Sequence, residues 1–207
     1  IITLDLSQND INAEGVAALA AVLPQSQVVS LNLGNNNKGA GDGLSRDVTT
    51  LRSSNAFEAN SNEISVDGAI ALAKALPQSQ ITSLDLSSNN IGAEGAIALA
   101  GALPQSQVTS LNLVNNEIGA EGAIVLARAL PQSKVINLNL WQNNIGDEGA
   151  SALANALLQS QITELNLWNN NIGAEGAIAL AKALPQSQDD EDEDRWPRLV
   201  QLTQTLK

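Results

Sequence analysis

Cysteine, histidine, tyrosine and methionine are all absent from the 207 residues, and aromatic residues make up only 2% of them. Without Cys and His, the chain cannot form disulfides, ordinary zinc sites, cysteine nucleophiles or Ser-His-Asp triads. No apolar run approaches the roughly 18 residues that a membrane-spanning helix needs, so we expect no membrane span. Because Met is missing, we expect the natural chain to begin upstream of Ile1. The lack of Cys also leaves the cellular location open.

Basic residues are scarce as well, with 10 Lys and Arg against 22 Asp and Glu and a net charge of -12. Binding to a phosphate backbone depends on clustered Lys and Arg, and a strongly acidic chain repels it. We therefore do not expect nucleic acid as a partner.

What the sequence does contain is an internal repeat. Leu84, Leu111, Leu138 and Leu165 are each 27 residues apart, and every good copy holds a short alternating strand, an Asn turn, an apolar helix and a Pro-Gln-Ser connector. One such unit cannot bury its own apolar face, but stacked units share a core. We therefore predict an α/β horseshoe solenoid with an inner parallel sheet, outer helices and about seven 27-residue repeats. The copies begin near Ile1, Val28, Ser54, Ile81, Val108, Val135 and Ile162.

The framework positions of each copy follow one pattern, LxLxxNxIxxxGxxxLxxxL. In one copy these positions are Leu84, Leu86, Asn89, Ile91, Gly95, Leu99 and Leu103. The pattern resembles the leucine-rich repeat of the ribonuclease-inhibitor type. The nearly identical, Ala-rich and Gln-rich copies also resemble leucine-rich repeat effectors that intracellular bacteria deliver into host cells. This second resemblance implies delivery into the host cytoplasm and a host protein or another bacterial effector enzyme as the partner.

Two stretches break the repeat. The array is predicted over residues 1–188, with a divergent repeat at 38–59 that is either a surface loop or irregular repeat, or the trace of two compensating frameshifts. Residues 189–194 are six consecutive acids, and they cannot form a buried strand. In the remaining residues up to 207, Trp196, Leu199, Thr203 and Leu206 share one helical face. We interpret 189–207 as an acidic run and a C-terminal capping helix, and a detachable partner-binding helix is the alternative.

The recurring Asn and Gly residues are interpreted as structural. An Asn at each strand exit can bond the backbone of the turn. Gly residues recur at the helix starts without GxxxxGK[ST] or GxGxxG motifs, so we expect no nucleotide site, no cofactor and no metal. The Asn ladder is Asn9, Asn36, Asn62, Asn89, Asn116, Asn143 and Asn170, and the Gly row is Gly15, Gly68, Gly95, Gly122, Gly149 and Gly176.

The concave positions, which the framework does not dictate, carry the functional prediction. After the second strand leucine the copies change from small to large residues, ending in Val114, Trp141 and Trp168. Adjacent strands lie about 4.8 Å apart, so the two indoles should be neighbours with Val114 beside them. They form either a partner-binding patch or a stacked pair that only shields the sheet. The predicted polar residues around them are Asn112, Asn139, Asn166, Asn137, Glu164, Gln142, Asn169 and Asp85. The alternative for Asn139 and Asn166 is simple inheritance by duplication.

Catalysis would need two of the concave carboxylates close together. Asp85 and Glu164 come from copies three apart, or about 14 Å, beyond the spacing of paired glycosidase carboxylates. We therefore expect a non-enzymatic, monomeric module that binds and blocks or regulates another protein through its concave sheet. The alternative is the ligand-sensing repeat region of a larger receptor.

Overall fold

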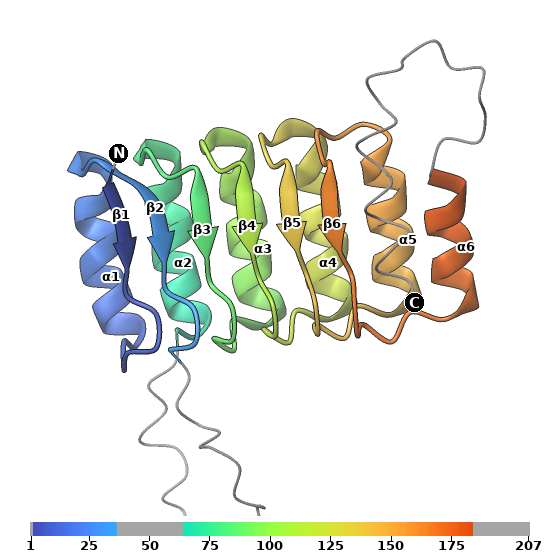
Figure 1. The fold of residues 1–207 in the computed structure, drawn as a ribbon, viewed down its shortest axis with the longest axis horizontal. Helices are drawn as coiled ribbons and strands as arrows, with labels where there is room; N and C mark the ends of the chain where they lie inside the picture. The colour runs from blue at the N-terminus through green and yellow to red at the C-terminus, as the bar shows by residue number, and fades with distance from the viewer. Residues whose placement is uncertain (1, 37–63, 184–207) are drawn as a thin grey trace, which may run out of the picture.

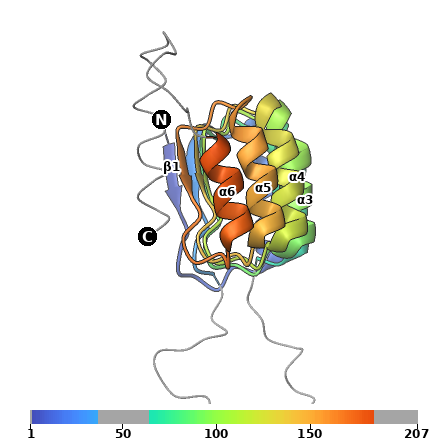
Figure 2. The ribbon, with the colours of Figure 1, turned by 90° about the vertical axis from the view of Figure 1, so that its right-hand side faces the viewer.

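In the computed structural model of the chain, residues 2–36 and 64–183 are described. Within them, six strands form one parallel sheet in chain order, and the helices lie on one side of it (Figure 1). Figure 2 shows sheet and helices as two layers seen from the end. The strands are β1 (Ile2–Asp5), β2 (Val28–Asn32), β3 (Ser83–Asp85), β4 (Ser110–Asn112), β5 (Asn137–Asn139) and β6 (Glu164–Asn166).

A helix follows every strand and runs back along the outer layer. Consecutive helices pack side by side along the array. The helices are α1 (Ala13–Val22), α2 (Val66–Ala75), α3 (Gly92–Ala102), α4 (Gly119–Ala129), α5 (Gly146–Leu157) and α6 (Ala174–Ala183). The predicted α/β solenoid with an inner parallel sheet and outer helices is confirmed.

Prolines end the helices as the sequence predicts. After α1, α2, α3 and α4, a Leu-Pro-Gln turn of 3-10 helix leads to the next strand; the four turns are η1 (Leu23–Gln25), η2 (Leu76–Gln78), η3 (Leu103–Gln105) and η4 (Leu130–Gln132). Leu158 replaces the proline after α5, which is the longest of the six described helices at 12 residues. The proline therefore shortens the helix and sets the turn back to the sheet.

The core lies between the two layers and follows the leucine pattern. In β4 and the residue after it, Leu111 and Leu113 are buried, whereas Asn112 between them is half-buried and faces the concave side. Gly122 shows why glycine recurs at the helix starts. A Cβ there would lie 2.5 Å from Ile118 Cγ2 and 3.1 Å from Ala96 Cβ of the preceding helix, so only glycine allows this approach.

The step from β2 to β3 departs from the 27-residue spacing of the other steps. Strand β2 pairs directly with β3, with Leu31 beside Leu84 and Ser30 beside Ser83. Partners across this step are 53 residues apart, as in the bond from Thr82 to Val29, instead of 27. The described residues contain six strands, each followed by an α-helix, and Ser54, where the third copy is predicted to begin, lies outside them.

Several predictions fall outside the described residues. These are the divergent repeat at 38–59, the ladder residue Asn62, the acidic run at 189–194 and the capping helix that follows it. Among the described helices, none combines the length and apolar character that crossing a membrane requires.

Candidate functional site

The turns below the concave face are held by the buried Asn ladder. Asn143 is fully buried, and its Oδ1 accepts the backbone N–H groups of Asn116 and Ile118 in the preceding repeat at 3.0 and 3.3 Å. Its Nδ2 donates to the carbonyls of Leu113, Leu140 and Trp141 at 2.8 to 3.1 Å. These bonds satisfy backbone groups that would otherwise be buried without partners. The structural role predicted for the ladder is thus visible at this residue.

A second row of Asp and Asn residues also has a structural use, which the sequence prediction missed. In each one, Oδ1 accepts the backbone N–H of the residue two positions later, at 2.9 to 3.2 Å, in an Asx turn that ends the strand. The signal was in the sequence, because each of the six described strands has Asp or Asn at this position. The row is Asp5, Asn32, Asp85, Asn112, Asn139 and Asn166.

Trp141 and Trp168 lie together, as the gradient along the copies predicts. Their ring centroids are 4.8 Å apart, and the rings are tilted by 55°. The backbone N–H of each is held by the Asx turn of its own strand, from Asn139 and Asn166. Trp168 keeps 49% of its surface exposed, whereas Trp141 is half-buried and its buried Nε1 has no hydrogen-bond partner among the described residues. Shielding is thus incomplete, since one ring still faces solvent.

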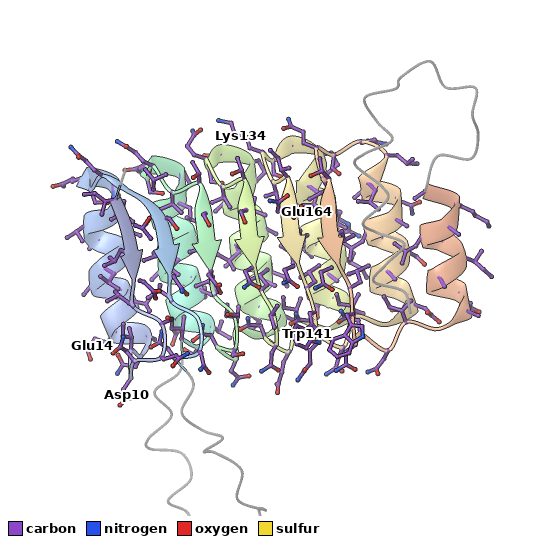
Figure 3. The ribbon with its side chains drawn as sticks, viewed as in Figure 1. Asp10, Glu14, Lys134, Trp141 and Glu164 are labelled. Atoms are coloured by element: carbon purple, nitrogen blue, oxygen red, sulfur yellow. The ribbon has the colours of Figure 1, made fainter. Side chains whose placement is uncertain are left out.

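The predicted flanking residues of the indoles lie on the turn at the strand exits. Val114, half-buried, holds the equivalent position in the neighbouring repeat, and the next residue, Asn115, donates its backbone N–H to the Trp141 carbonyl at 2.9 Å. Gln142 and Asn169 are exposed in the left-handed backbone region, at φ of 56° and 55°. Figure 3 shows Trp141 at this edge of the sheet, Glu164 farther up the concave face and Lys134 at the opposite edge.

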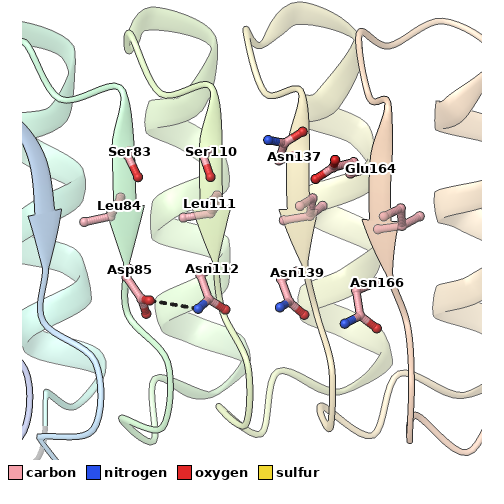
Figure 4. A pocket seen from close by; sticks show the side chains of 12 residues that line it. Ser83, Leu84, Asp85, Ser110, Leu111, Asn112, Asn137, Asn139, Glu164 and Asn166 are labelled. Atoms are coloured by element: carbon pink, nitrogen blue, oxygen red, sulfur yellow. Dashed lines mark hydrogen bonds between the residues drawn. The ribbon is translucent and has the colours of Figure 1, made fainter. Parts of the chain in front are cut away.

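A shallow, open groove of about 560 Å³ runs across β3 to β6, beside the indoles (Figure 4). Six predicted residues line it, and the two Trp residues do not. Ser83 and Ser110 also line it; they were missed, although they occupy the column of Asn137 and Glu164, one residue before the first strand leucine. The predicted lining residues are Asp85, Asn112, Asn137, Asn139, Glu164 and Asn166.

The carboxylates of the concave face differ in their bonding. Asp5 accepts hydrogen bonds from the Ser7 hydroxyl and from the Ser7 backbone N–H. These bonds, the hydroxyl bond most of all, hold the pKa of Asp5 below the ordinary value of 3.8. Asp85 makes the same pair of bonds to Ser87, and its second oxygen accepts from Asn112 at 2.9 Å (Figure 4). Glu164 is exposed, and its carboxylate has no hydrogen bond or ion pair with any described residue. No cluster of three or more metal-ligating side chains occurs in the described segments.

Comparison with known proteins supports the repeat architecture. A leucine-rich repeat family model matches residues 1–20, 80–100, 107–127, 134–154 and 161–181, together about half of the chain. A solved structure of the leiomodin-1 actin-binding site 2 is similar in fold, with a TM-score of 0.55 and 17% identity over 93% of this chain and 94% of that one. No curated protein sequence matches the chain. Repeat solenoids of this kind present concave surfaces that bind other molecules. The chain belongs to the leucine-rich repeat family.

Proposed function

We propose that this chain is a non-enzymatic, protein-binding module that holds its partner against the concave sheet at the C-terminal half of the array. The observation that carries the proposal is the Trp141–Trp168 pair at the border of the polar groove, with Trp168 half exposed. Contiguous apolar side chains exposed on a protein surface often mark a contact site, and Trp is enriched among the residues that dominate interface energies. The groove supplies the polar surroundings that such an anchor needs.

The proposed mechanism is that binding blocks or positions an active surface of the partner. The resemblance of the repeat to the ribonuclease-inhibitor type supports this mechanism, and the resemblance of the copies to bacterial effectors supports a host protein or another effector enzyme as the partner. Actin binding is a property named for the leiomodin structure, whose 17% identity conveys only the fold. We therefore do not extend actin to this chain.

The experiment compares the native chain with the Trp141→Ala/Trp168→Ala double variant. Both are used to select binders from a display library of bacterial and animal protein fragments. Binders of the native chain should lose at least about tenfold in affinity for the double variant, because two anchor residues are removed. Circular dichroism and the unfolding midpoint establish that the variant is folded.

A matched control removes the same number of exposed apolar side chains elsewhere. Leu158 and Ile178, each 54% exposed, belong to the helical layer. Leu158→Ala/Ile178→Ala should leave the affinity of the selected binders unchanged. Equal affinity for the native chain and the Trp double variant would show that the indole pair is not the interface.

A further inference from the structure

The described strands of the concave sheet carry negatively charged side chains and no positively charged ones. In the described part of the chain, the strands contain three acids, Asp5, Asp85 and Glu164, and no Lys or Arg. The four basic residues described are elsewhere: Lys74, Arg128 and Lys182 in the helices, and Lys134 in a connector, where it donates to Gln107. The only charged groups that the described strands present to a partner are therefore carboxylates. These favour cationic side chains on the partner and disfavour anionic ones.

Among these three acids, Glu164 is the one whose carboxylate makes no hydrogen bond within the described residues. The Oδ1 atoms of Asp5 and Asp85 already accept hydrogen bonds from Ser7 and Ser87, two residues beyond the ends of their strands. The Glu164 carboxylate is exposed and has no bond within the described residues. It also lies in β6, the strand that leads to Trp168. The unbonded carboxylate in β6 and the exposed indole, two residues beyond the end of β6, therefore belong to the same repeat and the same face.

The distance between Glu164 and Trp168 defines the spacing of the partner side chains that can contact both residues. Glu164, Asn166 and Trp168 alternate onto the concave side, and at about 3.3 Å per residue the first and last are about 13 Å apart. An extended chain has the same rise, so two of its residues four positions apart span the same distance. Between them, the Nδ2 groups of Asn139 and Asn166 donate no hydrogen bond to described residues, although their Oδ1 atoms are in use. These amides can donate to main-chain carbonyls of a bound segment.

We propose that the partner presents an extended segment with a Lys or Arg and a large apolar residue four positions apart, the cation at Glu164 and the apolar side chain at Trp168. This inference rests on the proposed function, because it assigns the chemistry of the partner at that same site. Arg suits the site better than Lys, since its planar guanidinium pairs with a carboxylate through two hydrogen bonds.

The test uses blocked five-residue peptides and the full ¹⁵N-labelled chain. Leu-Thr-Pro-Thr-Arg and its reverse have the required spacing. A peptide with Leu and Arg only two positions apart and one with Glu in place of Arg are the controls. Binding is followed through the indole Nε1–H signals of Trp141 and Trp168 at low salt. At least one four-spaced Arg peptide should shift both signals and bind about tenfold more tightly than either control peptide.

Two variants identify the charge that matters. Glu164→Gln should weaken the Arg peptide by about five- to tenfold, whereas the matched change Asp5→Asn, at the other end of the sheet, should have less than about a twofold effect. Both side chains are exposed, so both variants should fold. Equal binding of the Arg and Glu peptides, equal binding at the two spacings, or an unchanged affinity in Glu164→Gln would overturn the inference. If fragments selected in the preceding experiment depend on the Trp pair but not on Glu164, the proposed function stands and the cationic partner is wrong.

Discussion

Replacing Asn143 with Ala tests whether the buried ladder, and not the leucine core alone, holds consecutive repeats together. The variant removes five side-chain hydrogen bonds. Two of the affected carbonyls keep another donor, because Leu140 still accepts from Asn170 and Trp141 from the Asn115 N–H. Three backbone groups lose the partner that the structure shows for them: the N–H groups of Asn116 and Ile118 and the carbonyl of Leu113.

Each unsatisfied buried group costs about 1 to 3 kcal/mol, and some relaxation or entry of water will reduce the sum. We therefore expect Asn143→Ala to lower the free energy of unfolding by about 3 to 6 kcal/mol, a large share of the 5 to 15 kcal/mol typical of a domain. Because each repeat contacts only its neighbours, the loss should be greatest in β4, β5 and their turns.

Urea unfolding followed by circular dichroism measures the total loss, and amide hydrogen exchange shows where protection falls. Asn155→Ala is the control, because Asn155 is exposed on α5 and the substitution should change stability by no more than about 0.5 kcal/mol. A loss below about 1 kcal/mol in Asn143→Ala would refute the reasoning, since it would mean that the ladder bonds are replaced at little cost.

Three further predictions concern single features of the fold. Glu117→Asn should raise stability by about 0.5 to 1 kcal/mol in urea unfolding, because Glu117 has a φ of 56° and the equivalent residues of three other repeats are Asn; no gain would contradict the assigned turn. Removing residues 189–207 should lower the melting temperature if they cap α6, where Ile178 is 54% exposed, and an unchanged melt would exclude that role. The lowered pKa of Asp5 means that its carboxylate stabilises the fold at pH values above the ordinary pKa of 3.8, and this stabilisation is lost as the pH falls through the lowered pKa. Asp5→Asn keeps a side-chain oxygen that can accept the same hydrogen bonds but cannot titrate. The free energy of unfolding, measured from pH 5 to 2, should therefore depend less on pH in this variant.

The regular part of the fold could be predicted because each framework position has one physical task that repeats every 27 residues. The leucines at 111 and 113 and the Asn at 116 show the period of a strand followed by a turn, and the structure places them so. The irregular step could not be predicted in the same way. Asn62 restores the spacing of the copies, which suggested a third strand, but only pairing in space shows that β2 continues directly to β3.

The positions of the candidate residues could be predicted from the repeat, but the hydrogen bonds that they make could not. Adjacency of Trp141 and Trp168 follows from register, so the sequence was sufficient for it. Sequence alone did not reveal that the Oδ1 atoms of Asn139 and Asn166 accept backbone N–H groups in Asx turns. The residue type at a concave position is the same whether its side chain bonds its own backbone or a partner. Sequence alone also did not separate the groove from the indoles, which lie at the edge of the sheet beside it.

The direct pairing of β2 with β3 also has a mechanical consequence. If the array were stretched from its ends, repeats would be released one after another, because each is held only by its neighbours. A 27-residue repeat would lengthen the chain by about 9 nm, at roughly 3.4 Å per residue. Release of the unit between β2 and β3 would free the 53 residues closed within it, or about 18 nm. In a force-extension trace, one step of double length among equal steps would therefore mark the position of the irregular repeat.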